Sequence, residues 1–220
     1  MDDLLSEKEQ IEKMRTWWSD YGLYVIGGIV LGAAILFGIN YYQAQTVNAE
    51  VAASVLYDEI TEYVVNGDVE AAEVSAGKLD GEYGNSSYAA QSKLAMARLY
   101  MDKNRDQDAV QALNELLAMN GSEHLKHVAR VRLAKILLYQ GKPEEVLSLL
   151  EGQGNVAFAA RYAEELGDAY VALGRYDEAR ASYQAALGEA QPTVDQGVIQ
   201  LKLMDIPAEA ASTPGEDDSE

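Results

Sequence analysis

The sequence predicts an all-α protein with one N-terminal transmembrane helix followed by an α-solenoid of about four helix pairs. An uncharged, mostly apolar stretch lies near the N-terminus. Beyond residue 43, apolar residues recur at intervals of three and four, which is the period of a helix, and short breaks recur at nearly constant spacing. The chain therefore divides into an N-terminal segment (1–20), a transmembrane helix (21–42), a repeat domain (43–204) and an acidic tail (205–220).

The composition excludes several classes of function. The 220 residues carry 17 basic and 36 acidic side chains, a net charge of -19, whereas binding to a nucleic-acid backbone needs clustered Lys and Arg. The absence of cysteine excludes disulfides, thiolate metal sites and cysteine nucleophiles. We therefore expect no nucleic-acid partner.

The stretch from residue 21 to residue 49 contains no charged side chain, and its apolar centre covers residues 23–39. With its flanks it supplies about 20 residues, or roughly 30 Å of helix, which is enough to cross a hydrocarbon core. Aromatic side chains flank it at both ends, as at membrane interfaces: Trp17, Trp18, Tyr21, Tyr24, Tyr41 and Tyr42. A cleaved signal peptide fits less well, because an acidic segment of twenty residues precedes a run longer than a signal core. A buried core helix is a weaker alternative.

Orientation follows from the basic residues near the span. Lys8, Lys13 and Arg15 precede it, and the first basic residue after it is Lys78. This bias predicts a cytoplasmic N-terminus and a translocated repeat domain. Within the span, Gly28 and Gly32 form a small-xxx-small pair that would let a partner helix approach closely, although glycine is also common in membrane helices.

Four short breaks, at Gly67, Asn104, Gly141 and Gly174, divide the rest of the chain with spacings of 37, 37 and 33 residues. A period near 34 is typical of tetratricopeptide repeats. We expect the first helix of the first repeat to continue from the membrane segment. The alternative is a helical bundle without repeats.

The last repeat matches the tetratricopeptide pattern most fully. Gly167 is expected to let the paired helices approach, and Tyr183 to fill the space between them. Pro192 is expected to end the second helix. The other signature positions of this repeat are Leu166, Tyr170, Gly174, Tyr176, Ala179 and Ala186. The tail that follows has six acids, no base and two prolines, a composition that predicts disorder.

Residues 9–22 (EQIEKMRTWWSDYG), a glycine-rich span ending near Tyr41 and Tyr42, and degenerate repeats to about residue 204 resemble the YfgM-type ancillary subunit family of the SecYEG translocon. The resemblance implies a non-enzymatic protein of the cell inner membrane with a periplasmic repeat domain. It also implies SecYEG and the chaperone PpiD as partners, and an adaptor role for unfolded secretory proteins. The alternative function is restraint of a cytoplasmic stress-response regulator through residues 1–20, where Ile11, Met14, Trp17 and Trp18 are spaced as on one helix face.

Solenoids bind partners along a concave groove, and the repeat register predicts which side chains line it. The predicted groove residues are Leu94, Arg98, Met101, Val131, Lys135, Leu138, Glu164, Asp168 and Val171. A mixed apolar and polar groove suits extended or helical peptide segments. The alternative for Leu94, Met101, Val131 and Leu138 is that they pack between helices.

Catalysis finds little support in the sequence. Glu123, His124 and His127 lie close together. His124 and His127 could bind a metal from one helix face, but a third close ligand is missing. Ser122 is expected to cap the helix that begins there. We therefore expect no enzyme activity, no cofactor, no metal and no small-molecule substrate. One basic island stands out in this acidic chain: Lys126, Arg130, Arg132, Lys135 and Lys142. It would contact an acidic partner or an anionic membrane, or form an ordinary solvated helix face.

Overall fold

The computed structural model describes residues 7–154, 156–188 and 194–207. Within these residues the chain is α-helical, with one short 3₁₀ turn (η1) and no strand, so the predicted all-α class is confirmed. The helices are α1 (Glu7–Asn66), α2 (Val69–Tyr83), α3 (Ser87–Asp102), α4 (Asp106–Ala118), α5 (Glu123–Tyr139), α6 (Pro143–Leu150), α7 (Ala159–Ala172), α8 (Tyr176–Gly188) and α9 (Gln196–Asp205). Contacts divide the chain into two compact units between Ala52 and Ala53.

Helix α1 carries the apolar stretch. It contains an 18-residue window of mean hydropathy 2.3, so it is long and apolar enough to cross a membrane. It also runs without interruption to Asn66, as expected for a first repeat helix that continues from the membrane segment. Nothing lies within 4 Å of a Cβ built on Gly28 or Gly32. Their role in helix packing therefore stays a prediction.

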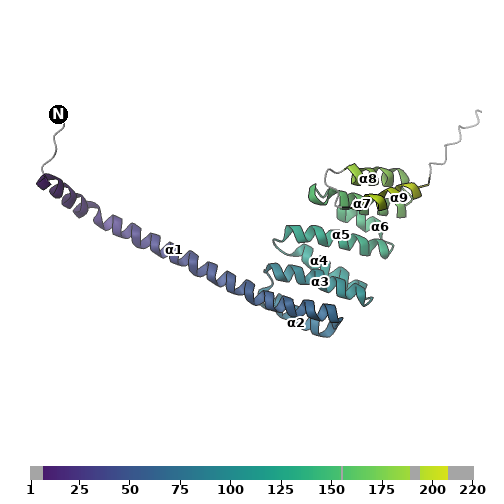
Figure 1. Cartoon of the computed structure of the whole chain (residues 1–220), viewed down its shortest axis with the longest axis horizontal. Helices are drawn as coiled ribbons and strands as arrows, with labels where there is room; N and C mark the ends of the chain where they lie inside the picture. Colours follow the sequence, from purple (N-terminus) through teal and green to yellow (C-terminus); the bar gives the residue numbers. More distant parts are fainter. Residues whose placement is uncertain (1–6, 155, 189–193, 208–220) are drawn as a thin grey trace, which may run out of the picture. The chain divides into compact units, whose positions relative to one another are not determined.

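From Ala53 onward, the described helices form four pairs followed by a single helix (Figure 1). The end of α1 packs with α2 through Ile60, Ala72 and Leu79, and the next pairs are α3 with α4, α5 with α6 and α7 with α8. The first helices of successive pairs also touch, α3 with α5 and α5 with α7. This arrangement agrees with the predicted solenoid of about four helix pairs.

The four predicted breaks are the turns inside these pairs. Gly67, Asn104, Gly141 and Gly174 all have positive φ, between 58° and 72°. After each, the next backbone N–H donates to the carbonyl five residues earlier, at 2.8 to 3.0 Å. This is the Schellman ending of a helix, in which a left-handed residue satisfies carbonyls that the helix leaves free. The left-handed conformation explains why the breaks are marked by glycine and asparagine.

Helix starts are capped unevenly. Asp68 and Ser86 each accept a hydrogen bond from the backbone N–H three residues ahead, at 3.1 Å. The expected cap by Ser122 is wrong, because this residue makes no side-chain capping bond to α5. Its φ of 54° is left-handed, whereas a capping side chain reaches the first turn from an extended backbone.

The last pair is closed by one tight contact. A Cβ on Gly167 would lie 2.4 Å from the ring of Tyr183, which is itself only 2% exposed. Ala179 and Ala186 are fully buried beside it. The predicted roles of these small residues are confirmed, since a larger side chain on α7 would push α8 away.

The structure contains a helix that the repeat pattern does not predict. Helix α9 follows the last pair, and Ile199 and Ile206 are buried against α8. The sequence predicts a tail from residue 205, whereas Asp205 ends α9 and Ile206 is packed. Pro192, expected to end α8, and residues 208–220 lie outside the described residues.

Replacing Gly167 with alanine is expected to destabilise the repeat domain by about 1–3 kcal/mol, because the added methyl group overlaps the Tyr183 ring. The measurement is chemical unfolding of the full chain, followed by the helical circular-dichroism signal. The matched control is Gly77→Ala in α2, where a Cβ meets nothing within 4 Å and the change should be neutral or slightly stabilising. Equal effects at both positions would contradict this account of the contact.

Candidate binding surface of the repeat domain

The nine predicted groove residues lie on the first helices of three successive pairs, three each on α3, α5 and α7. They differ in exposure. Leu94 and Val131 are buried between helices, at 9% and 7% exposure. Arg98, Lys135 and Val171 are exposed, and the remaining four are half-buried. The predicted surface is therefore a polar and apolar mixture above a packed layer.

A hollow of about 240 Å³ lies between α3 and α5. Three predicted residues meet there: Arg98, Met101 and Lys135. Three further lining residues were not among the predicted groove residues: Ala97, Arg132 and Ile136. The sequence did place Arg132 in the basic island, so its charge was visible, but its register position did not point to the groove. We name these six residues the cationic hollow.

Three cations surround this apolar hollow in a chain with a net charge of -19. Arg132 is exposed as a whole residue, and its Nη1 donates to the Leu94 carbonyl at 3.0 Å. Burial, and then the nearby Arg98 charge, lower the pKa of the Arg132 guanidinium. Among the described residues no carboxylate forms an ion pair with Arg132. An anionic group entering the hollow would relieve this crowding of like charges.

The remaining two cations of the hollow are weakly held. Arg98 lies 3.8 Å from Asp102 in an exposed pair, which contributes little. Lys135 Nζ lies 3.4 Å from Glu165 Oε1, and its side chain is 62% exposed. Arg98 can therefore turn toward a ligand at small cost, whereas Lys135 also compensates the buried Glu165 carboxylate.

The predicted groove residues on α7 are differently placed. Lys202 of α9 contacts Glu164 at 2.9 Å and Asp168 at 2.7 Å. Burial alone would lower the pKa of Lys202, but the hydrogen bonds to Asp168 and Glu164 outweigh it and raise that pKa. Tyr183 also donates to Asp168 at 2.6 Å. These two acids are thus neutralised by the chain itself, through a long-range pairing that no local sequence pattern indicates.

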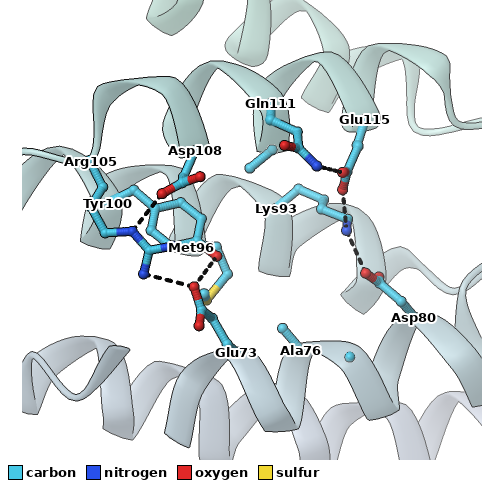
Figure 2. A pocket seen from close by; sticks show the side chains of 12 residues that line it. Glu73, Ala76, Asp80, Lys93, Met96, Tyr100, Arg105, Asp108, Gln111 and Glu115 are labelled. Carbon is cyan, nitrogen blue, oxygen red and sulfur yellow. Dashed lines mark hydrogen bonds and ion pairs between the residues drawn. The ribbon is translucent and has the colours of Figure 1, made fainter. Parts of the chain in front are cut away.

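A second hollow, of about 270 Å³, lies among α2, α3 and α4 (Figure 2). Its charges are paired with one another. Lys93 bridges Asp80 and Glu115, and Arg105 contacts Glu73 at 2.9 Å as well as Asp108. Such mutual pairing suits a structural joint between repeats more than a binding site.

Part of this joint recurs in the last repeat. Tyr100 donates to Glu73 at 3.1 Å and lies under the Arg105 guanidinium, 4.7 Å from the ring centroid. Burial and this hydrogen bond raise the pKa of Tyr100 to about 12. Tyr170 likewise donates to Glu151 at 2.8 Å and lies 4.6 Å under Arg175. The repeat thus preserves a tyrosine–arginine contact at the turn, together with an acid from the preceding pair.

The two histidines considered for a metal lie among aromatic rings. His127 stacks on Phe158 at 5.2 Å and contacts the Tyr162 hydroxyl through Nδ1. His124 meets the edge of the same Phe158 ring at 5.3 Å. No group of three metal-binding side chains occurs in the part of the chain that the structure describes. Burial lowers the pKa of His127, which suits a packed neutral imidazole.

These features define a class: a helical-repeat protein with an apolar N-terminal helix and an open hollow on its repeats. The family model for the tetratricopeptide repeat-like domain matches residues 15–208, and the chain belongs to this family. The repeat-like family suggests a protein that binds without catalysis.

Curated relatives align along nearly the whole chain. One from Escherichia coli (strain K12) is 26% identical over 199 residues, covering 90% of this chain and 95% of the relative. Relatives from Haemophilus influenzae (26% identical, 90% and 97% covered) and Neisseria gonorrhoeae (27%, 90% and 96%) align similarly. All three are named "Ancillary SecYEG translocon subunit". The resemblance predicted from the N-terminal stretch and the repeats is therefore confirmed.

The buried carboxyl group of Glu165, which pairs with Lys135 of the cationic hollow, should make the stability of the repeat domain depend on pH. It is 2% exposed on α7, and burial raises its pKa to about 7, although Lys135 acts in the opposite direction. Because this pKa lies above the ordinary 4.5, the folded state binds more protons between about pH 4.5 and 7. The free energy of unfolding should fall as pH rises through that window. Above about pH 7 the carboxyl group is ionised and the loss of stability is complete.

Replacing Glu165 with glutamine is therefore expected to stabilise the repeat domain at pH 8, by on the order of 2 kcal/mol, and to change little at pH 4.5. Unfolding midpoints of the full chain at both values measure this difference. The control is Glu123→Gln on the surface of α5, where the Lys126 hydrogen bond lowers the carboxyl pKa and the sign is opposite. A Glu165→Gln effect independent of pH would contradict the assigned titration.

Proposed function

We propose that this chain is a non-enzymatic ancillary subunit of the SecYEG translocon. In this role it is an adaptor that links translocating chains to periplasmic chaperones such as PpiD through protein–protein binding. The observation that carries the proposal is the name shared by the relatives over 90% of the chain. The apolar helix and the repeat domain supply the two parts that such an adaptor needs.

The proposal includes a topology. The chain crosses the inner membrane once, with residues 1–20 in the cytoplasm and the repeat domain in the periplasm. The basic residues support this orientation, because Lys8, Lys13 and Arg15 precede the span and the next basic residue is Lys78.

The two parts of the chain would divide the work. The span alone reaches the lateral surface of a translocon within the bilayer, and Gly28 with Gly32 gives it a face for close packing. The repeats present the cationic hollow, whose apolar floor and cationic rim suit a peptide segment that carries both an apolar and an acidic side chain. Unfolded secretory proteins and chaperone segments are the expected occupants.

Replacing both Gly28 and Gly32 with leucine is expected to weaken co-purification of SecYEG or PpiD in mild detergent, since the bulkier side chains hold a partner helix away. Membrane insertion should survive, because hydropathy does not fall. The control is Gly38→Leu, which lies on another side of the helix and also meets nothing within 4 Å. Normal recovery of both partners by the double variant would place the docking surface elsewhere.

A photocrosslinker at Met101 in the full chain is expected to capture an arrested translocating chain, because Met101 lines the cationic hollow. Arg98→Glu should lower the yield by removing a rim cation. Lys78→Glu makes the same change of charge at an exposed position of α2 and should leave the crosslinking yield unchanged. A crosslinker at Val74, which is 61% exposed outside the hollow, is the positional control. Equal capture of the translocating chain from Val74 would contradict the assignment of the cationic hollow as its binding site.

The alternative function, restraint of a cytoplasmic stress-response regulator, rests on one observation. Ile11, Met14, Trp17 and Trp18 are all more than half exposed on the N-terminal part of α1. Removal of residues 1–9 with the span retained distinguishes the two functions. A changed regulator level would favour the alternative, and an unchanged level would reject it.

A further inference from the structure

Helix α9 has two apolar faces, and the repeat domain covers only one of them. Ile199 is fully buried and Ile206 nearly so, against Ala179, Tyr183 and Ala186. On the other face Val198, Leu201 and Met204 are 42%, 63% and 78% exposed. These three residues follow one another at intervals of three, so they form one strip along the helix. We name them the α9 strip.

An exposed apolar strip is unusual at this position. The last helix of a repeat stack normally presents a polar outer face, because no further repeat covers it. A helix that is apolar on both sides is typical of a buried element. The α9 strip therefore lacks a covering element among the described residues.

The charges near the strip decide what can cover it. Asp195 and Asp205 lie at the two ends of α9, and both are exposed. The neighbouring cations are already engaged. Lys202 contacts Glu164 and Asp168, and Arg180 contacts Asp177 and the Pro207 carbonyl. The strip thus has an acidic surround with no cation left to balance it locally.

Two candidate occupants fit poorly. Residues 208–220 contain no apolar side chain larger than alanine and proline, so the continuing chain cannot cover three large apolar residues. A second copy would bring an identical acidic segment and a further net charge of -19 against the first. Like charges brought together at an interface disfavour association. A cationic partner meets neither objection.

We propose that the α9 strip docks an amphipathic helix of a partner protein, one whose apolar face is flanked by lysine or arginine. Leucine-type side chains of that helix pack on Leu201 and Met204, as in other helix-on-helix recognition. Its flanking cations meet Asp195 and Asp205 at the two ends of α9. This site is separate from the cationic hollow, so it does not depend on the function proposed for that hollow.

The test uses the full chain in phosphatidylcholine nanodiscs and a fluorescent 18-residue peptide with a leucine face and lysine flanks. Anisotropy should show binding that weakens at least about tenfold for Leu201→Ser with Met204→Ser, since anchor residues dominate such contacts. The control is Val65→Ser with Val74→Ser, two exposed apolar residues on other helices, which should leave binding unchanged. The same peptide with glutamate in place of lysine should bind at least about tenfold more weakly.

Three outcomes overturn the proposal. The first is equal binding of the lysine and glutamate peptides, because charge would then play no part. The second is unaltered binding by the Leu201→Ser and Met204→Ser variant. The third is a dimer of the wild-type chain, seen by sedimentation outside nanodiscs, that the same two substitutions dissociate. That result would assign the strip to a second copy. Helical content measured on each variant separates a lost site from a lost fold.

Discussion

The repeat domain depends on the close approach of the two helices in each pair, and one backbone conformation makes that approach possible. Gly67, Asn104, Gly141 and Gly174 are left-handed, so the chain reverses within turns of two or three residues. The bond from the following N–H back across the turn then fixes where the second helix begins. In the last pair, the missing side chain of Gly167 completes the contact by admitting the Tyr183 ring. The stacking of successive pairs depends on this internal geometry.

This dependence explains which parts of the fold could be predicted from the sequence. A left-handed turn and a crowded contact restrict residue type, so the breaks and the small residues were visible at their spacing. Helix α9 was not, because a ten-residue segment that is apolar on two sides shows no clear helical stripe. The pairing of Lys202 with Glu164 and Asp168 joins residues 34 to 38 positions apart, and no local pattern reports such a contact.

The two hollows illustrate how pairing separates a structural joint from a candidate site. Around Glu73 and Lys93 each ionised group meets a partner of opposite charge, so a ligand would have to displace existing ion pairs. In the cationic hollow, Arg132 forms no ion pair with a carboxylate among the described residues, and burial together with the nearby Arg98 charge lowers its pKa. Register predicted Arg98, Met101 and Lys135 there, but it missed Arg132, which directly follows the predicted position Val131.

Acidity is general in this chain, and that makes the location of its few cations informative. With 36 acids and 17 bases, most basic side chains can find a local carboxylate, as Lys126 and Arg180 do three residues away along their helices. Where cations gather and one of them, Arg132, forms no ion pair among the described residues, as in the cationic hollow, the surface can recognise an anionic segment. Where acids surround an apolar strip and every nearby cation is engaged, as at α9, the complementary partner is cationic. The repeat stack thus has two surfaces that prefer partners of opposite charge: the cationic hollow prefers an acidic segment and the α9 strip a basic one. A single acidic or basic segment cannot bind well to both.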